Sequence, residues 1–474
     1  PGQSLRFSYL GYADHVAKIS GAVSHLDVQL EESSTSLDDV VVVAYGTQRK
    51  GDVLSSISTT GSKELMRAPV STTSGALIGK IAGVNSRNTE GTPGSSANIQ
   101  IRNLGTPLYV IDGVVSDAGH FNQLGLTDIE SISVIKDGAA AIYGVKAANG
   151  VVLVQTKRGK NTGGRISVGV NAYYGWQSWN RFPEMGNAYE VTRAEYEGQI
   201  NSGVAVDVAA AKERLQKYKE GYYNPETGED YRSFDWTSFA RKNVPQSYFN
   251  IYSSGGGDRV NYYVSISKVD QDAVFKNFNR ANFQANVSAN ITDNLSISMA
   301  SSGRKEVRKN PGLESDDDYM YMRWGMIAND PRYRPYANDN PKYPAYNDYG
   351  NGLFNLGAKD ISNAGFYEDI WRVFQGTWDI QWKTPLEGLT VKGLYSYYYA
   401  TKERTAFQKA YDFYSYDYAT DTYNVVKRME DSWMQRGEDG IEENTYQFTL
   451  NYDRTFAEDH HVTVLAGFEA QNRK

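Results

Sequence analysis

The sequence contains no cysteine and only five histidines. The absence of cysteine excludes disulfide scaffolds, thiolate metal sites and cysteine nucleophiles, and it is compatible with export through an oxidising compartment. No H-E-x-x-H or G-x-S-x-G motif is present. His460 and His461 are adjacent in the chain, and successive strand residues point to opposite faces, so the two side chains cannot easily share a metal ion. We expect both to be surface residues. We therefore expect no catalytic residues, no metal ligands and no cofactor.

Long apolar runs and a surplus of positive charge are also missing. No window approaches 18 consecutive apolar residues, which excludes a transmembrane helix. The net charge of −7 offers no basic stripe, so nucleic acid is not an expected partner. Two glycine-rich stretches, Gly79–Val84 and Gly91–Ser96, lack the spacing of a phosphate-binding loop, and nucleotide binding is not expected.

Aromatic residues and strand-like alternation are abundant. The chain has 36 Tyr, 8 Trp and 17 Phe, and its mean hydropathy is −0.56. A low average is compatible with a membrane β-barrel, because lipid-facing and inward-facing residues alternate along each strand. Nine segments alternate in this way, most of them about ten residues long, as a tilted membrane strand requires. They are 165–176, 247–255, 259–269, 281–291, 294–302, 371–382, 389–400, 445–454 and 461–471.

The joins between these segments alternate between short turns and long polar stretches, at 178–245, 303–370 and 401–444. Such asymmetry is typical of periplasmic turns and extracellular loops. The first stretch predicts a helix near Val206–Glu220. The second is rich in Tyr, Asn, Asp and Pro, which suits sugar or peptide binding, although a solvated loop is the ordinary interpretation. The acidic run Glu314–Asp318 lacks the spaced pattern of a calcium loop and is interpreted as a solvated face.

The first third of the chain has a different pattern. Three Val- and Ile-rich runs beginning at Leu108, Ser131 and Gly150 are bounded by turn residues and predict strands. An Ala-rich turn of helix closed by Gly144 and Gly150 is expected between the last two. These elements predict a small α+β unit.

This wording resembles the plug domain of SusC/RagA-type TonB-linked outer-membrane proteins. The resemblance runs through LDDVVVVAYGTQ (37–48), ALIGKIAGV (76–84), GTPGSSANIQIR (91–102), YVIDG (109–113) and TKRGK, which ends at Lys160. These motifs cover about a quarter of the chain in the family's order. One departure is the stretch Asn103–Thr106, where the family usually has several more residues.

The resemblance implies a fold that is mainly β, with an α+β plug inside a large antiparallel barrel. A plug of about 115 residues has a radius of gyration near ~13 Å, whereas a barrel of eight or nine strands is filled by side chains. The chain is therefore expected to hold part of a 22-stranded barrel. The expected domains are the end of a β-sandwich (1–31), a linker with the TonB box (32–48), the plug (49–160) and the first part of the barrel (161–474).

Val40–Ala44 is a run of high β-propensity, for which a buried strand is the ordinary interpretation. Because it lies between a polar linker and a basic stretch, with no evident hairpin partner, it also suits strand addition to a partner protein. By resemblance it is the TonB box, and the residues expected to bind TonB are Asp39, Val40, Val41, Val42 and Val43. The plug signature, placed at turns and strand ends, comprises Gly79, Gly83, Arg102, Asp112, Gly113, Gly144 and Gly150.

The function implied by the resemblance is TonB-dependent import of an oligomeric nutrient, a glycan or an oligopeptide, across the outer membrane. The expected partners are TonB with ExbB and ExbD, a SusD-like surface lipoprotein and outer-membrane lipid, and the resemblance allows for a dimer of such pairs. The plug and TonB box would face the periplasm. An adhesin or signalling receptor on the same scaffold is the alternative. An enzyme of polysaccharide breakdown would need placed carboxylates, which the sequence does not demonstrate.

Overall fold

The computed structural model describes residues 3–7, 15–19, 28, 40–43, 46–49, 57–67, 69–88, 91–179, 183–273, 277–311, 324–346, 355–358, 361–429, 431–457 and 460–474. The acidic run Glu314–Asp318 lies outside these residues, as do most of residues 1–31, which were expected to end a β-sandwich. The chain divides into two compact units, 1–91 with 95–157 and 92–94 with 158–474. In the described part of the chain, no helix combines the length and apolar character that crossing a bilayer requires.

The first unit is built on a five-stranded sheet in the order β5-β10-β11-β8-β9. The three predicted runs form β8, β10 and β11, where β11 pairs parallel with β8 and antiparallel with β10. The bounds are β5 Ile57–Gly61, β8 Leu108–Ile111, β9 Val114–Ser116, β10 Ile129–Ile135 and β11 Val151–Thr156. Smaller pairs are β1 Gln3–Phe7 with β2 His15–Ile19, β3 Val40–Val43 with β4 Gly46–Arg49, and β6 Val84–Arg87 with β7 Asn98–Ile101.

Short helices cover this sheet and complete its core. They are α1 Ser62–Leu65, α2 Thr73–Ala76, α3 Ala118–Asn122, η3 Leu126–Asp128, η4 Gly138–Tyr143 and η5 Val145–Ala147. Leu65, Phe121, Ile132 and Val152 are fully buried in one cluster. The Ala-rich turn is 3₁₀ rather than α-helical, and Gly144, at φ 73°, ends it after six residues.

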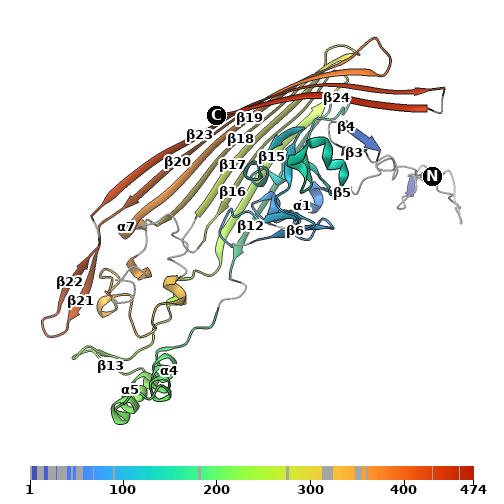
Figure 1. Cartoon of the computed structure of the whole chain (residues 1–474). Coiled ribbons are helices and arrows are strands. Elements are labelled where there is room, and N and C mark those ends of the chain that lie inside the picture. The colour runs from blue at the N-terminus through green and yellow to red at the C-terminus, as the bar shows by residue number, and fades with distance from the viewer. Residues whose placement is uncertain are drawn as a thin grey trace. The chain divides into compact units, whose positions relative to one another are not determined.

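The second unit contains a nine-stranded antiparallel sheet in which all nine predicted segments are strands, side by side in Figure 1. The strands are 12 to 24 residues long, longer than expected. They are β12 Ile166–Gln177, β15 Val244–Gly256, β16 Val260–Gln271, β17 Asn277–Asn290, β18 Leu295–Pro311, β19 Gly365–Lys383, β20 Leu389–Gln408, β23 Trp433–Phe456 and β24 His460–Arg473. The extra length lies in polar segments such as Gly303–Pro311, which join the ladder through backbone hydrogen bonds without showing alternation.

The two faces of this sheet differ in polarity. One, the apolar face, presents exposed Val, Ile and aromatic side chains: Ile166 is 69% and Ile266 is 58% exposed. The other, the polar face, carries buried polar side chains, for example Asn250, Gln284, Asn286 and Ser396. Because successive strand residues point to opposite faces, this division follows directly from the alternation in the sequence.

Candidate functional site

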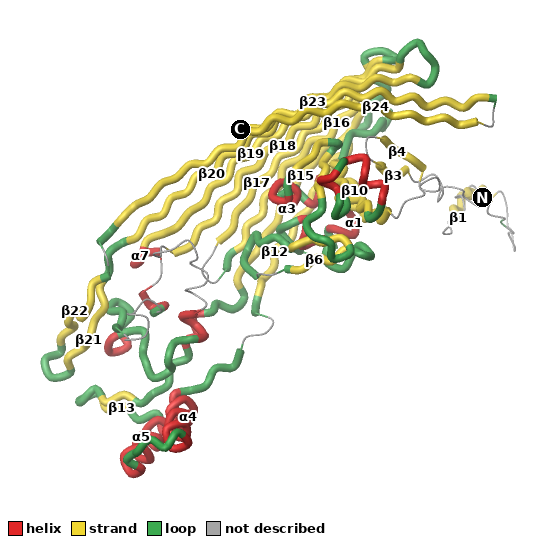
Figure 2. The backbone as a smooth tube through the Cα atoms, in the orientation of Figure 1, coloured by secondary structure: helices red, strands yellow, loops and turns green. Residues whose placement is uncertain are grey.

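Three long joins leave the same end of the nine-stranded sheet and together form what we call the loop body (Figure 2). The first contains α4 Ala188–Asn201, α5 Val208–Glu220, β13 Tyr223–Asn224, β14 Glu229–Asp230 and η6 Trp236–Phe239. The second contains η7 Ala337–Asp339, η9 Leu356–Ala358 and α7 Ile361–Ala364, and the third contains β21 Asp412–Asp417 and β22 Thr422–Arg428. Two small apolar clusters pack within the body: Ala240 with Met326 and Leu356, and Ala358 with Phe413 and Met429.

The helices of the first join have well-formed ends. The predicted helix is confirmed as α5, where Asp207 accepts hydrogen bonds from the backbone N–H groups of residues 209 and 210 and Gly221 ends the helix in the left-handed conformation. Helix α4 was missed by the sequence analysis. Its signal was the capping box formed by Asn187 and Glu190, in which each side chain accepts from the other residue's backbone N–H.

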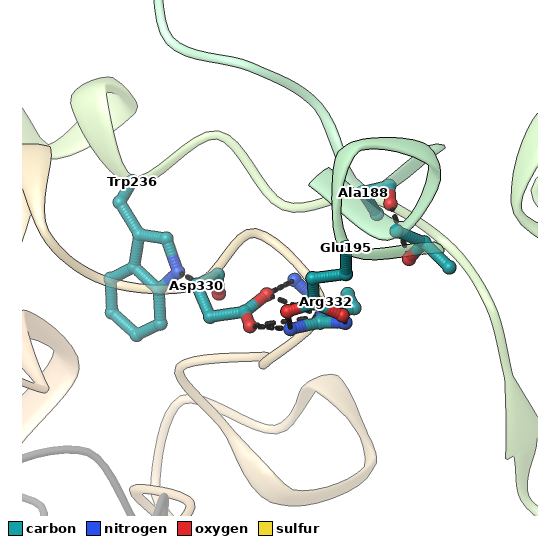
Figure 3. Close-up of polar contacts among 6 residues, drawn as sticks. Ala188, Glu195, Trp236, Asp330 and Arg332 are labelled. Atoms are coloured by element: carbon teal, nitrogen blue, oxygen red, sulfur yellow. Dashed lines mark hydrogen bonds and ion pairs between the residues drawn. The ribbon is translucent and has the colours of Figure 1, made fainter. Parts of the chain in front are cut away.

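An ion-pair clasp connects the first and second joins (Figure 3). The guanidinium of Arg332 donates to both carboxylate oxygens of Glu195 on α4, at 2.5 and 2.6 Å, and its Nε donates to Asp330 Oδ1 at 2.9 Å. The indole of Trp236 donates to the backbone carbonyl of Asp330 at 3.1 Å. Hydrogen bonds to Asp330 and Glu195 raise the pKa of Arg332 above its ordinary value. A planar guanidinium suits this two-sided arrangement better than an ammonium group.

A second charged group lies between β14 and η7. Arg232 pairs with Asp230 at 2.6 Å and with Asp339 at 2.8 Å, and it stacks 3.9 Å above the ring of Tyr223. Burial pushes the pKa of Asp230 upward, but the hydrogen bonds from Arg232 outweigh this effect and leave the pKa lowered. Arg334 pairs with the same Asp339. Arg232 thus connects Asp230 of the first join to Asp339 of the second.

Tyrosines bring the third join into the loop body. Tyr343 stacks on Tyr423 with ring centroids 3.7 Å apart and meets Tyr414 edge-on at 5.0 Å. Tyr418 lies so close to Gly228 that a side chain there would overlap its ring. Burial raises the pKa of Tyr418 to about 12. These aromatic contacts connect the second and third joins of the loop body.

Amide side chains connect strands on the polar face of the sheet. Gln177 and Gln271 both donate to Oε1 of Gln246, at 2.7 and 3.1 Å. Gln271 also accepts a hydrogen bond from the backbone N–H of Gly94, at 3.2 Å. The carbonyl of Gly94 accepts from Arg308 at 3.3 Å. The segment Thr92–Gly94 belongs to the second unit, and these hydrogen bonds lie within that unit.

The signature residues of the first unit shape turns. Gly79, Gly83, Gly113, Gly144 and Gly150 all have positive φ, and so do Arg102, at 51°, and Asp112, at 49°. The carboxylate of Asp112 accepts from both the backbone N–H and the hydroxyl of Thr156, at 3.0 and 2.6 Å. Arg102 donates its backbone N–H to Gly83. Their described contacts are therefore structural and do not gather them into one binding cluster.

Val40–Val43 differs from its expectation in one respect. The prediction that it has no hairpin partner is wrong, since it pairs antiparallel with β4, Val40 opposite Arg49 and Val43 opposite Gly46. The basic stretch that seemed to isolate it supplies the partner strand. Asp39 lies outside the described residues. His460 and His461 begin β24 and are exposed, as expected.

Comparison with known proteins finds a plug domain and similar TonB-dependent receptors. The TonB-dependent Receptor Plug Domain matches residues 49–151. TonB-dependent receptor P26 of Formosa agariphila is 34% identical over 57% of this chain and 27% of its own length. TonB-dependent receptor SusC of Bacteroides thetaiotaomicron is 27% identical over 72% of this chain and 32% of its own. The chain thus spans less than half the length of these relatives.

Solved structures show the same relationship. The RagAB peptide importer in its open-open state matches with a TM-score of 0.69 and 25% identity, over 92% of this chain and 50% of that chain. Its closed-closed state matches with a TM-score of 0.66 at 24% identity, a likeness of fold. The plug match, the nine-stranded sheet and the relatives agree. The chain carries a TonB-dependent receptor plug domain and is similar to SusC- and RagA-type TonB-dependent receptors.

Proposed function

We propose that the protein imports an oligomeric nutrient, a glycan or an oligopeptide, across the outer membrane in a TonB-dependent manner. The observation that carries the proposal is the sheet with an exposed apolar face and a buried polar face in a chain that also carries a plug domain. A wall of this kind suits lipid on one side and a hydrated path on the other. We place the plug at 49–160 and the wall at 161–474, with the plug and TonB box facing the periplasm.

In this mechanism the chain makes and breaks no covalent bond. TonB, driven by ExbB and ExbD, would bind Asp39–Val43 and pull, and the plug would rearrange to open a path. Strand β3 belongs to a two-stranded sheet in the described chain. TonB would therefore add to its other edge or displace β4, and in both cases main-chain hydrogen bonds would supply the affinity.

The proposed partner at the cell surface is a SusD-like lipoprotein that covers the loop body and delivers the ligand. The loop body supports this assignment because its joins pack together and present a formed surface rather than separate tethers. One solved structure that matches over most of this chain is that of a RagAB peptide importer. Residues 1–31 are assigned to the end of a β-sandwich, and a dimer of transporter and lipoprotein pairs is the proposed assembly.

Deletion of Asp39–Val43 tests the proposal. We expect energised uptake of the ligand to be lost while binding to purified protein is unchanged, because the deleted segment touches TonB and not the ligand. Uptake by cells and binding in detergent are measured on the same variant. A matched deletion of five residues in the preceding linker, Glu32–Ser36, is the control and should retain uptake.

Native purification from outer membranes, with mass spectrometry of bound proteins and ligands, supplies the second measurement. A co-purifying SusD-like lipoprotein with an oligomer would support import. Wild-type protein that binds a ligand but shows no uptake would instead favour the adhesin or signalling receptor.

A further inference from the structure

Three residues in the first part of the chain belong to the second unit. Thr92–Gly94 groups with residues 158–474, whereas 1–91 and 95–157 form the first unit. The strands on either side of this segment along the chain, β6 and β7, pair with each other. The chain thus leaves the first unit in the loop between two paired strands and returns directly afterwards. We call Thr92–Gly94 the anchor segment.

The backbone of Gly94 is held by two side chains of the wall. Gln271 on β16 accepts a hydrogen bond from its N–H group at 3.2 Å, and Arg308 on β18 donates to its carbonyl at 3.3 Å. All three residues of the anchor segment are buried. Buried backbone groups that lose their hydrogen-bond partners are costly. Withdrawal of the anchor segment would therefore be opposed at both polar groups of Gly94.

The two side chains that bind Gly94 are themselves fixed by neighbours. The amide nitrogen of Gln271 donates to Gln246 on β15 at 3.1 Å, and Gln246 also accepts from Gln177 on β12 at 2.7 Å. Nε of Arg308 donates to Glu306 at 2.9 Å. Side chains that other contacts have already ordered lose little further conformational freedom when they bind. A force on the anchor segment would thus be distributed over strands β12, β15, β16 and β18.

Close packing adds to these hydrogen bonds. The ring of Phe278, which is fully buried, lies directly against Gly94, and an added Cβ there would come within 2.4 Å of the ring. The guanidinium of Arg308 lies 5.5 Å from the centre of the same ring. Gly94 has a φ of 69°, a conformation that glycine adopts without strain. The anchor segment is therefore seated by its shape as well as by its backbone bonds.

The anchor segment divides the first unit into unequal parts. Residues before it supply β5 to the five-stranded sheet, and β5 is an edge strand that joins β10 through five residue pairs. Residues after it supply β10, β11, β8 and β9, which are neighbours in that order. An edge strand is paired on one side only. The residues before the anchor segment can thus leave the sheet without interrupting the ladder of the other four strands.

Extraction of those residues would also open the apolar core. Leu65 and Leu77, which precede the anchor segment, are buried in one cluster with Phe121 and Ile132, which follow it. Exposing apolar side chains to water is unfavourable, so this step needs external work. A force strong enough to open one part of the core would continue into the rest unless a fixed point stopped it.

We propose that the anchor segment ends the rearrangement that TonB drives. A pull on Asp39–Val43 would extract residues up to Gly91, and at Gly94 the force would pass into the wall. Strands β8, β9, β10 and β11 would stay folded. This inference rests on the proposed import function and deepens it, because it sets how much of the plug opens. The positioning residues are Gln271, Phe278 and Arg308.

Single-molecule pulling on the full-length protein in lipid vesicles tests the anchor segment in the absence of TonB. This chain has no cysteine, so Asp39→Cys supplies a handle at the point where TonB would bind. Extraction from residue 39 to residue 91 would release about 50 residues, which corresponds to ~170 Å of extended chain. We expect extension at constant force to stop at that length.

Two variants weaken the anchor in different ways. Gln271→Ala removes the acceptor of the Gly94 N–H group, and Arg308→Met removes the donor to its carbonyl while keeping an apolar stem. Each should shorten the lifetime of the stop about five- to tenfold, as expected for one buried hydrogen bond. Gln375→Ala is the matched control, because Gln375 is 8% exposed against 7% for Gln271 and its amide donates to Ser396. It should leave the lifetime unchanged.

Thiol labelling in energised cells tests the same point during uptake. Leu65→Cys, before the anchor segment, and Val152→Cys, after it, replace fully buried residues of one core cluster. We expect a maleimide that enters the periplasm to label residue 65, and we expect an uncoupler of the proton gradient to abolish this labelling. Residue 152 should stay unlabelled, and it should become labelled when Gln271→Ala is added. Deletion of Asp39–Val43 should abolish labelling at both positions.

The outcomes separate the anchor from the proposed function. Extension that passes residue 91 without a stop, an unchanged lifetime in both Gln271→Ala and Arg308→Met, or an equal loss in Gln375→Ala would overturn the anchor. Gradient-dependent labelling of residue 152 with Gln271 intact would overturn it too. A stop at ~170 Å without labelling of either residue would support the anchor and overturn TonB-driven import.

Discussion

At the scale of single residues, Gly94 is a tightly constrained position of the second unit. It has a positive φ of 69°, and an added Cβ would lie 2.4 Å from the ring of Phe278. Both of its backbone polar groups are bound, by Gln271 and Arg308. Sequence alone suggested a turn glycine here. The sequence did not show that the ring of Phe278 lies against Gly94, because the two residues are almost 200 positions apart in the chain.

Gly94→Ala should therefore destabilise the protein through both strain and overlap, by about 2–4 kcal/mol. Gly163→Ala is the matched control, since Gly163 also has positive φ but no atom within 4 Å of the added Cβ. It should cost about 1–2 kcal/mol. Denaturation of the protein in detergent compares the two. Adding Phe278→Ala to Gly94→Ala should relieve the overlap, and strictly additive losses would contradict this account.

At the scale of elements, the β21–β22 hairpin depends on carboxylates at both ends. Asp412 accepts hydrogen bonds from Arg428 at its base, which lower the pKa of Asp412. Asp417 accepts from the backbone N–H groups of Ala419 and Thr420 in the turn, which lower the pKa of Asp417. Carboxylates with lowered pKa stabilise the hairpin while they are ionised.

The backbone amides of this hairpin should accordingly become less protected from hydrogen exchange as the pH falls. A group with a lowered folded-state pKa contributes its full stability above its unfolded pKa, about 3.9 for Asp, and loses it as the pH falls through the folded value. Amide hydrogen exchange at residues 412–428 should accelerate between pH 6 and pH 3, relative to the intrinsic rate. Asp412→Asn should already exchange faster at pH 6 and show a smaller change. Unchanged protection in the parent protein would refute the prediction.

The existence and order of the strands were predictable, and their ends were not. Alternation located every strand of the large sheet because one face is apolar. The segments Thr401–Thr405 and Gln435–Gly440 carry no apolar alternation, so the same signal stops although their backbone ladder continues. Helix α4 does not follow from the alternation. The Glu195–Arg332 clasp does not follow from any local pattern, because it joins residues more than 130 positions apart.

At the scale of the molecule, the apolar face defines where lipid would contact the wall. Val264 on β16 lies in the apolar part of this face. Val307 on β18 lies on the same face, at the level where Arg372 pairs with Glu403. The plug and the wall were predictable from sequence because each has its own pattern. The loop body was not, since contacts between joins depend on how the strands bring them together.

The same substitution at these two positions should locate the bilayer. Val264→Arg should destabilise the inserted protein by about 2–4 kcal/mol, and Val307→Arg by about 0–1 kcal/mol. Unfolding of the full-length protein from lipid vesicles, followed by electrophoretic mobility, measures both. Equal costs would place the lipid boundary elsewhere.

The pairing of β3 with β4 has a mechanical consequence. The strands are antiparallel and Val43 pairs with Gly46, so Val40 and Arg49 are at the open end. A force applied from the N-terminal side would break the residue pairs of this hairpin one at a time, starting at Val40 and Arg49. The twenty residue pairs between β20 and β23 would instead share a load applied along the strands. Opening the hairpin would release about ten residues, or ~33 Å of extended chain, before tension reaches the plug. The β3–β4 hairpin would therefore lengthen the connection between TonB and the plug before force acts on the plug itself.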